Sequence, residues 1–438
     1  MRDVHAISLG GVGRTGMRIL PLETGLIFRS CIRMKIDTKW VRSQFPAFDV
    51  PSLQGQAFFE NAGGSYACRQ VVDRLHRFYT ERKVQPYAPY DASRKGGDEM
   101  DEARRRLAEM LGVATQEVSF GPSTTQNTYV LANAVRRWLK PGQSIIVTNQ
   151  DHEANSGPWR RLAEEGITVR EWQIDPETGL LDPADLENML DDNTKLVVFP
   201  HCSNVIGAIN DVAAITRIAH QAGAKVCVDG VSYAPHGFAD VGAMGCDVYL
   251  FSAYKTYGPH QGIMVIREDF GRELPNQGHS FNGETLYYRF TPAGPDHAQV
   301  AASAGMADYM EAFSTHHGGG MGADAARTAH DVMRAHEVDL LQPLLDYVSA
   351  KNSVRLIGPA QAQTRAPTVA MALNGSAEEA AETLAPMGIM AGGGDFYAVR
   401  PLSAMGVDLA KGVLRVSFVH YTQTAEVDAL ISALDQVL

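Results

Sequence analysis

Short apolar runs alternate with amphipathic stretches through the middle of the chain. Each run ends in polar residues or in glycine and proline, which is typical of a buried strand. The runs lie at 118–120, 144–148, 168–174, 195–200, 226–228, 249–251 and 262–267, with helical patterns between them at 128–139, 183–190 and 212–222. Strands that alternate with helices predict a parallel α/β sheet. The last run follows its neighbour closely, so we expect these two strands to pair in the antiparallel direction.

The pattern changes after residue 298. Two helical stretches, 298–313 and 323–350, lead to a segment in which strands and helices follow in α+β order. This segment contains strand 369–373, helix 377–386, loop 391–398, strand 413–418 and helix 424–437. We therefore predict a large domain over residues 34–320 and a smaller α+β domain over residues 321–438.

Residues 1–33 differ from both predicted domains. They show little periodicity and contain five arginines but only two acids, Asp3 and Glu23. We expect a disordered leader or an upstream start, with a targeting segment as the alternative, since transit peptides are rich in arginine and poor in acids. The glycine-rich run 10–16 lacks the ending of a phosphate loop and does not predict nucleotide binding.

Composition narrows the class of protein. With 45% hydrophobic and 20% charged residues, the 438-residue chain is typical of a soluble globular protein. The net charge of −11 argues against a nucleic-acid partner, and no apolar run approaches the roughly 18 residues of a membrane span. Five cysteines without a CxxC pair predict reduced thiols in a cytoplasm. The adjacent His316 and His317 cannot both face one ion on regular structure, so we expect no metal site.

Two charged residues follow neighbouring predicted strands. Asp229 comes directly after 226–228, and Lys255 follows 249–251. Ligands of open parallel sheets bind beyond the carboxyl ends of the strands, so both side chains are expected in one crevice. A desolvated lysine can attack a carbonyl, and an acid can hold a protonated ring nitrogen. Pyridoxal 5′-phosphate (PLP) requires both groups, although a salt-bridged pair at a sheet edge explains these two residues alone equally well.

Two further polar segments follow strands. Gly121-Pro122-Ser123-Thr124-Thr125 lies between strand 118–120 and a helix, where free N–H groups, the helix dipole and hydroxyls favour an anion such as phosphate. A simple Ser/Thr helix cap is the alternative. His152 follows strand 144–148 and could stack on a flat ring; the alternative is a solvated loop histidine.

Three motifs give the chain a resemblance to a known family. They are Asp229-Gly230-x-x-x-x-Pro235-His236-Gly237, Ser252-x-x-Lys255-x-x-Gly258-Pro259 and Asp151-His152-Glu153-Ala154-Asn155. Together they resemble the class V aminotransferase group of fold-type I PLP enzymes, within it the cysteine desulfurase-like branch, over about residues 40–438. The resemblance implies an α/β large domain with a mostly parallel seven-stranded sheet, whose N-terminal segment packs on the small α+β domain. It also implies a homodimer with active sites at the subunit boundary and a small amino-acid substrate.

The resemblance assigns roles to individual residues. Lys255 would form the Schiff base and shuttle the α-proton, and His152 would act with it as a catalytic residue that stacks on the ring. The remaining cofactor contacts would come from Asp229 at the pyridinium, Thr124, Thr125 and Ser252 at the phosphate, Ser232 where desulfurases place a glutamine, and the backbone of Gly294 from a partner subunit. Substrate contacts would come from Arg415 at the α-carboxylate, Asn204, Asn61 and Tyr397. Phe396 and the loop 278–292 are expected to shape the same pocket.

The chain departs from the desulfurases where they carry the sulfur-accepting thiol. Loop 391–398 reads AGGGDFYA and contains no cysteine. A thiolate is required to take sulfur from bound cysteine, so persulfide transfer by the usual route is not expected, and Cys202 is interpreted as a small core residue. The predicted function is β-elimination or C–S bond cleavage on a small amino acid. Aminotransfer or epimerisation, and a non-catalytic PLP-binding role, are the alternatives.

Overall fold

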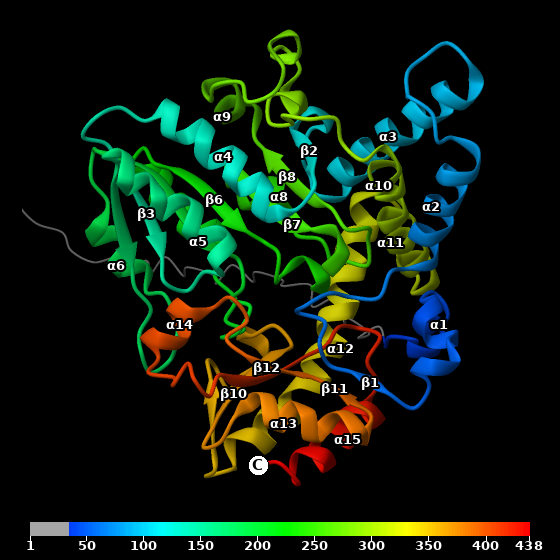
Figure 1. Cartoon of the computed structure of the whole chain (residues 1–438), viewed down its shortest axis with the longest axis vertical. Coiled ribbons are helices and arrows are strands. Elements are labelled where there is room, and N and C mark those ends of the chain that lie inside the picture. The colour runs from blue at the N-terminus through cyan, green and yellow to red at the C-terminus, as the bar shows by residue number, and fades with distance from the viewer. Residues whose placement is uncertain (1–34) are drawn as a thin grey trace, which may run out of the picture. The chain divides into compact units, whose positions relative to one another are not determined.

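A seven-stranded sheet organises the first part of the computed structural model, which describes residues 35–438 (Figure 1). The predicted leader, residues 1–33, lies outside the described residues. The strands are β2 (Val118–Gly121), β3 (Ser144–Thr148), β4 (Thr168–Trp172), β5 (Thr194–Pro200), β6 (Lys225–Asp229), β7 (Val248–Ser252) and β8 (Gly262–Ile266). Their order across the sheet is β2-β8-β7-β6-β5-β3-β4.

Only β8 runs against the other strands of this sheet. It pairs in antiparallel fashion with β7 and β2, while β4, β3, β5, β6 and β7 pair in parallel. The predicted mostly parallel sheet and its antiparallel strand are confirmed. Because β2 is flanked by β8, it has the same direction as β6 and β7, and the carboxyl ends of these three strands lie at one edge of the sheet.

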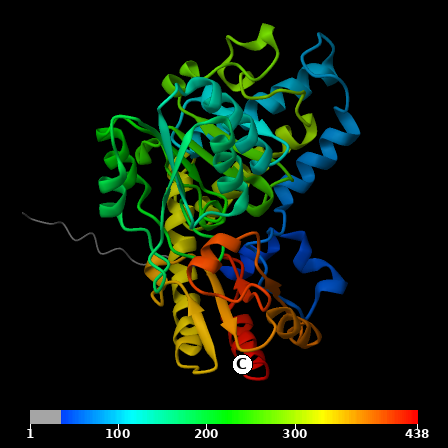
Figure 2. The same cartoon turned by 60° about the vertical axis from the view of Figure 1, so that its left-hand side comes forward.

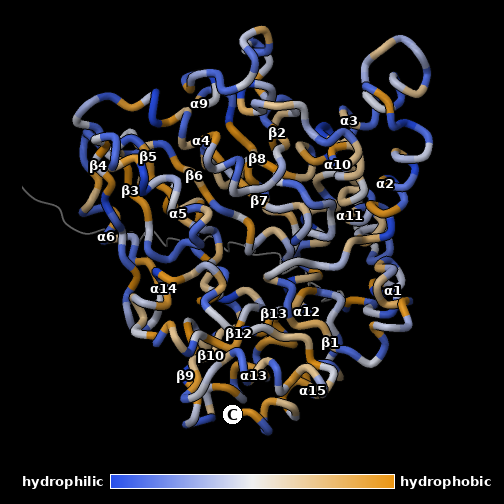
Figure 3. Tube along the Cα trace, in the orientation of Figure 1, coloured by the Kyte–Doolittle hydropathy of each residue, from blue (hydrophilic) through white to orange (hydrophobic). Residues whose placement is uncertain are grey.

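Helices cover both faces of the sheet, and alternate strand residues face opposite layers. Ile145 and Val147 pack with the layer formed by α4 (Thr124–Trp138), α5 (Glu153–Arg160) and α9 (Glu268–Glu273). Ile146, Val197 and Val226 pack in the opposite layer. That layer includes α2 (Arg69–Glu81), α3 (Asp91–Met110), α7 (Val212–Gln221), α10 (His297–Ala302), α11 (Ala304–His316) and α12 (Ala323–Ser349). Figure 3 shows the hydrophobic residues concentrated in the strands between these layers. Burial on both faces explains why the strands read as continuous apolar runs.

A second, four-stranded antiparallel sheet follows in the chain. Its order is β12-β13-β10-β9, with β9 (Val354–Ile357), β10 (Thr368–Leu373), β12 (Gly392–Gly394) and β13 (Val413–Ser417). The helices α13 (Ala377–Leu384), α14 (Val399–Ala404) and α15 (Thr424–Leu434) accompany it, and α12 runs from one sheet region to the other (Figure 2). Residues 35–438 form one unit by their contacts, so a domain boundary near residue 320 stays a prediction.

The first described residues lie against this second sheet. After α1 (Thr38–Ser43), strand β1 (Ala57–Phe58) pairs in parallel with β11 (Ile389–Met390), and Glu60 forms a parallel bridge with Ser417. The pairing brings residues 57–60 beside β13, although hundreds of residues separate them in the chain. This arrangement places Glu60 next to the strand that carries Arg415.

Within residues 35–438, no helix is both long enough and apolar enough to cross a membrane. Two further short helices of the first part of the chain are α6 (Pro183–Met189) and α8 (Val241–Met244). The four described cysteines (Cys68, Cys202, Cys227, Cys246) are free thiols in buried positions.

Candidate active site

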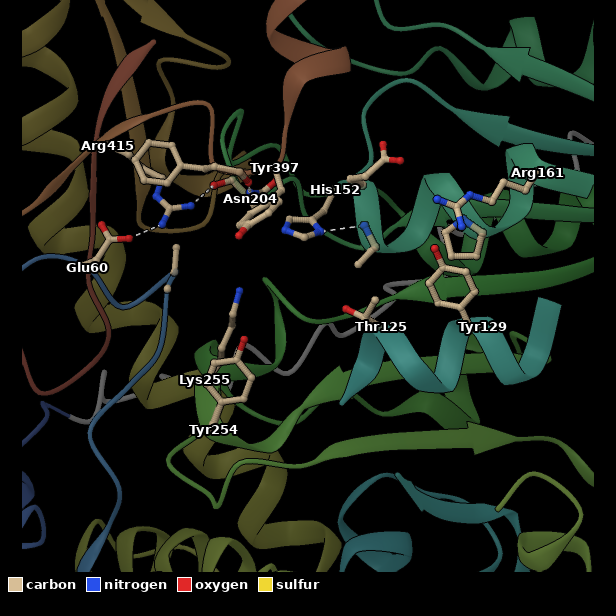
Figure 4. A pocket seen from close by; sticks show the side chains of 16 residues that line it. Glu60, Thr125, Tyr129, His152, Arg161, Asn204, Tyr254, Lys255, Tyr397 and Arg415 are labelled. Atoms are coloured by element: carbon tan, nitrogen blue, oxygen red, sulfur yellow. Dashed lines mark hydrogen bonds and ion pairs between the residues drawn. The ribbon is translucent and has the colours of Figure 1, made fainter. Parts of the chain in front are cut away.

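A cavity of about 610 Å³ lies at the carboxyl edge of the seven-stranded sheet, facing β13 (Figure 4). Thr125, His152, Lys255, Tyr397 and Arg415 line it. A smaller cavity of about 70 Å³ continues it inward and shares Thr125, His152, Asn204 and Lys255. The smaller cavity adds Thr124, Asp229, Ser232 and Ser252. The fold therefore brings together most residues that the sequence predicts for one site.

Lys255 occupies the short 3-10 turn that follows β7. The residue is only 8% exposed. Burial lowers the pKa of its amine from 10.5 to about 8, Arg415 lowers it further, and Asp229 and Glu60 oppose the shift. An amine with this pKa carries an appreciable neutral fraction near pH 7, and the neutral form is the nucleophile.

Asp229 closes β6 at the same edge. Its Oδ1 accepts a hydrogen bond from the Val231 N–H at 2.8 Å. Burial raises the pKa of this carboxyl to about 6, against the opposing effects of that N–H and of Lys255. A buried acid favours a cationic partner that keeps it ionised.

The turn between β2 and α4 offers hydroxyls at a helix start. Ser123 is the cap, since its Oγ accepts the Gln126 N–H at 3.2 Å. Thr124 and Thr125 follow in the first turn, and Oγ1 of Thr124 lies 2.7 Å from Oγ of Ser252. Gly262 leaves room for this turn, because a Cβ there would lie 2.5 Å from the Thr124 nitrogen. Capping and anion binding are thus compatible here, since different side chains are available for each.

His152 caps helix α5 and is not the solvated loop residue of the alternative interpretation. Its Nδ1 accepts the Ala154 N–H at 3.0 Å, which assigns the ring proton to Nε2. Burial lowers the pKa of the imidazole to about 4, with further lowering by Lys255 and Arg415. The ring is therefore neutral near pH 7 and presents an N–H donor.

The opposite wall centres on Arg415 of β13. Its side chain is 4% exposed and forms an ion pair with Glu60. Its Nη1 donates to the Asn204 carbonyl at 3.2 Å, and its guanidinium carbon lies 3.7 Å from the ring centroid of Phe396. Burial lowers the pKa of Arg415, opposed by Glu60, and the buried Nε has no hydrogen-bond partner.

The loop 391–398 reaches this wall from the second sheet. Phe396 and Tyr397 both adopt left-handed backbone conformations, with φ of 52° and 57°. Their carbonyls accept hydrogen bonds from Asn204 Nδ2 and from the Glu153 N–H, each at 2.9 Å. The Tyr397 ring lies 5.5 Å from that of His152. These bonds fix two aromatic rings at the cavity.

Three features that the sequence predicts for the site, namely Asn61, Gly294 and loop 278–292, do not line the main cavity. Asn61 does not line the main cavity, because its side chain binds the Ser417 carbonyl at 3.2 Å and the Tyr421 hydroxyl. Gly294 and the end of loop 278–292 line a separate, more apolar cavity of about 700 Å³, which shares Thr125 with the first. Asn61, Ser232 and Lys255 line a narrow adjoining pocket together.

Sequence reasoning missed several residues of the main cavity, among them Glu60, Tyr129 and Arg161. Glu60 had a usable signal, since it is an acid that directly follows the apolar run 57–59. Buried acids are rare unless they are paired. Nothing in the sequence, however, indicates that its partner is 355 residues away.

Comparisons with known proteins agree with this geometry. The aminotransferase-like protein FGM3 of Gibberella zeae is 34% identical over 412 residues, which cover 91% of this chain and 98% of that protein. A cysteine desulfurase of Dickeya dadantii is 30% identical, over 91% of this chain and 96% of the relative.

Solved structures show the same fold. The cysteine desulfurase CsdA of Escherichia coli aligns with a TM-score of 0.78 at 23% identity, over 92% of this chain and 98% of that one. A cysteine desulfurase of Thermococcus onnurineus aligns with a TM-score of 0.79 at 22% identity, over 91% and 97%. A family model described as aminotransferase class-V matches residues 57–430. Members of this group are PLP-dependent enzymes, and the chain belongs to the class V aminotransferase family.

Proposed function

We propose that this chain is a PLP-dependent lyase that cleaves a bond at the β-carbon of a small amino acid, in the manner of a cysteine desulfurase but without a sulfur-accepting thiol of its own. The single observation that carries this proposal is the buried Lys255 amine, which lines both the inner cavity with Asp229 and the main cavity with Arg415. The relatives named as cysteine desulfurases support the reaction class.

The residues present fit PLP. A buried acid, an amine with a lowered pKa and a helix start that carries hydroxyl groups match the ring nitrogen, aldehyde and phosphate of that cofactor. Asn204 Oδ1 is buried without a partner in the cavity wall. Its Nδ2 donates to the Phe396 carbonyl, so Oδ1 is available to accept a hydrogen bond from a bound group. Lys255, Asp229, Thr124, Thr125, Ser252 and His152 would hold the cofactor.

The chain's own groups would then divide the work. Bound PLP supplies an electron-withdrawing ring that acidifies the Cα–H bond of a joined amino acid. Lys255 Nζ would take that proton and return one. Arg415 would bind the α-carboxylate, and the neutral His152 would stack on the ring. Tyr397 and Phe396 would enclose the substrate side chain.

Among residues 35–438, no thiol is positioned to receive sulfur in this cavity. None of the lining residues of the 610 Å³ cavity is a cysteine. Cys202 lines the inner cavity, but its Sγ donates to the Gly207 carbonyl at 3.3 Å, and burial raises its pKa to about 12. A buried, protonated thiol is a poor nucleophile. The leaving group is therefore expected to depart to solvent as a small molecule.

We expect the enzyme to act in a cytoplasm. Its expected partner is a second copy of the same chain. The separate cavity around Gly294 shares Thr125 and Tyr129 with the first, and space around Gly294 is open, with no atom within 4 Å of a Cβ built there. A partner backbone could contact the cofactor phosphate by this route. Sedimentation of the purified protein should give a dimer.

Product analysis tests the reaction. Purified protein loaded with PLP is incubated with cysteine and related amino acids, and sulfide, pyruvate and other keto acids are followed, with Lys255→Ala as the control. Keto-acid formation with release of the β-substituent, absent from the control, supports the lyase. Product that requires an added keto acid indicates a transaminase instead, and racemised substrate indicates an epimerase. Silence with every amino acid would leave only a binding role.

A further inference from the structure

An acid stands beside the arginine that would bind the substrate carboxylate. Glu60 accepts a hydrogen bond from Arg415 Nη2 through Oε1, while its Oε2 is buried without a hydrogen-bond partner (Figure 4). Two glycines make room for this carboxylate, because a Cβ would lie 3.0 Å from Oε1 at Gly63 and 3.3 Å from Oε2 at Gly392. The backbone of two distant segments thus accommodates Glu60 at this position.

The pair changes the charge that a substrate meets. An arginine without an acidic neighbour becomes neutralised when it binds a carboxylate. Here Glu60 already neutralises Arg415, whose side chain is only 4% exposed, so an incoming carboxylate adds a second negative charge at the buried end of the cavity. Like charges at a poorly solvated site repel strongly. A suitable substrate must bring a compensating charge.

We propose that Glu60 is a specificity-determining residue, which makes the site select amino acids whose side chain ends in a cation, an ammonium or a guanidinium. The inference rests on the proposed function, because it takes Arg415 as the carboxylate site and PLP as the partner of the α-amino nitrogen. That nitrogen is committed to the cofactor, so the end of the side chain is the part of the substrate that can bring a compensating cation. The Lys255 amine also interacts with Glu60, but it belongs to the protein and is the same for every substrate, so it does not discriminate between them.

Other charged residues of the cavity do not reverse this preference. Glu153 lines the cavity too, but both of its oxygens bind Arg160, at 2.9 and 2.7 Å. Arg161 lies toward the opposite end and would favour an acidic side chain (Figure 4). It is exposed, and its guanidinium carbon lies 5.6 Å from the Tyr129 ring centroid. Water and salt screen an exposed charge, whereas the Glu60 side chain is only 28% exposed and is paired with the buried Arg415.

Binding measurements on the PLP-loaded protein test the proposal. The cofactor absorbance is followed as lysine, arginine, norleucine or glutamate is added; lysine and norleucine share a carbon chain and differ in the terminal ammonium. Wild type is expected to bind lysine about tenfold or more tightly than norleucine, which corresponds to a charge interaction of moderate strength. In Glu60→Gln the ratio is expected to fall to within about threefold, mainly because norleucine binds more tightly. The lysine and arginine titrations distinguish the two cations.

A second measurement does not involve the cofactor. Calorimetric titration of the PLP-free protein compares 6-aminohexanoate with hexanoate, which carry a carboxylate but no α-amino group. The amino compound is expected to bind more tightly to wild type, and Glu60→Gln should remove this difference. Glu60→Asp retains the charge and should keep part of the preference, and Glu153→Gln is the matched control that should behave as wild type.

The outcomes separate this inference from the proposed function. Equal binding of lysine and norleucine by wild type, an unchanged ratio in Glu60→Gln, or tightest binding of glutamate would each overturn the role given to Glu60. If the proposed function itself fails, no amino acid alters the cofactor absorbance, or Arg415→Ala leaves every affinity unchanged. Circular dichroism of each variant confirms that the fold is retained.

Discussion

The candidate site, formed by the main cavity and the smaller inner cavity, has two walls that are assembled in different ways. On one wall, Asp229, Lys255 and Thr124 follow the ends of β6, β7 and β2, so that a single sheet positions all three. On the other wall, Glu60, Arg415 and Phe396 come from three separate segments that meet through one ion pair and one cation–π contact. The first wall is suited to hold a cofactor common to many reactions, and the second is suited to select a substrate.

This difference indicates which wall determines the choice of substrate. Residues at the ends of strands are held by the ladders of the sheet, and their geometry changes little when surface loops change. The second wall depends on contacts between loop 391–398, β13 and residues 57–60. Substitutions in the first wall should therefore affect all substrates alike, whereas those in the second should affect substrates unequally.

The largest effect is expected for Asp229→Asn. Removal of the negative charge takes away the ion pair of the ring nitrogen, and kcat/KM should fall on the order of 10²- to 10³-fold. The loss should be equal for all amino acids tested, because this residue does not contact the substrate side chain. Steady-state kinetics with two amino acids measures it, and unequal losses would break the comparison between the walls.

Arg415→Lys tests the second wall. Lysine cannot donate two parallel hydrogen bonds to a carboxylate, and KM should rise roughly 10- to 100-fold, which is the range for losing a hydrogen bond to a charged group. The value of kcat should change less. Arg161→Lys, at an exposed arginine of the same cavity, is the matched control and should leave KM near that of wild type. Equal effects of the two substitutions would contradict the assignment of Arg415.

The amine of Lys255 should set a pH dependence for cofactor capture. Its pKa is lowered to about 8, mainly by burial, so the neutral amine becomes the major form above that pH. The rate of Schiff-base formation with added PLP should rise about tenfold per pH unit up to pH 8 and then level off. Stopped-flow absorbance follows the reaction. A rate that keeps rising to about pH 10.4, as for a solvated lysine, would mean that the amine is not desolvated.

The smallest effect concerns backbone strain in loop 391–398, which belongs to the second wall. Tyr397 has a φ of 57° and its side chain is 72% exposed. At an ordinary position, glycine is less stable than alanine by roughly 0.5–1 kcal/mol, but a left-handed position reverses the order. Tyr397→Gly should therefore have a higher free energy of unfolding than Tyr397→Ala, by about 1 kcal/mol. Urea unfolding compares them, and the opposite order would exclude strain at this residue.

The first wall could be predicted from the sequence for a physical reason. Apolar runs mark the strands, and the polar residues at their carboxyl ends must lie at the edge of the sheet, so the sequence alone predicts Asp229 and Lys255 in one crevice. Thr124, which the family resemblance assigns to the cofactor phosphate, lines the same inner cavity. The motifs around them also carried the family resemblance, which the family match over residues 57–430 confirms.

The second wall could not be predicted in the same way. Glu60 meets Arg415 only because β1 pairs with β11 and residue 60 bridges to β13, and such long-range pairings leave no periodicity in the sequence. The side chain of Asn61 is bound to Ser417 and Tyr421 and lines a narrow pocket beside Lys255, so its contact with the substrate stays a prediction. The last residues of loop 278–292 line the separate cavity around Gly294, and the role of this loop at the substrate also stays a prediction.

The proposal that Lys255 forms the Schiff base with PLP is tested most directly by identifying the amine that binds the cofactor. Wild-type protein is incubated with PLP, reduced with borohydride and digested, and the peptides are analysed by mass spectrometry. We expect to find the reduced cofactor on the peptide that contains Lys255, and no label above background in Lys255→Ala. A label on another lysine, or a reducible chromophore that persists in Lys255→Ala, would contradict it.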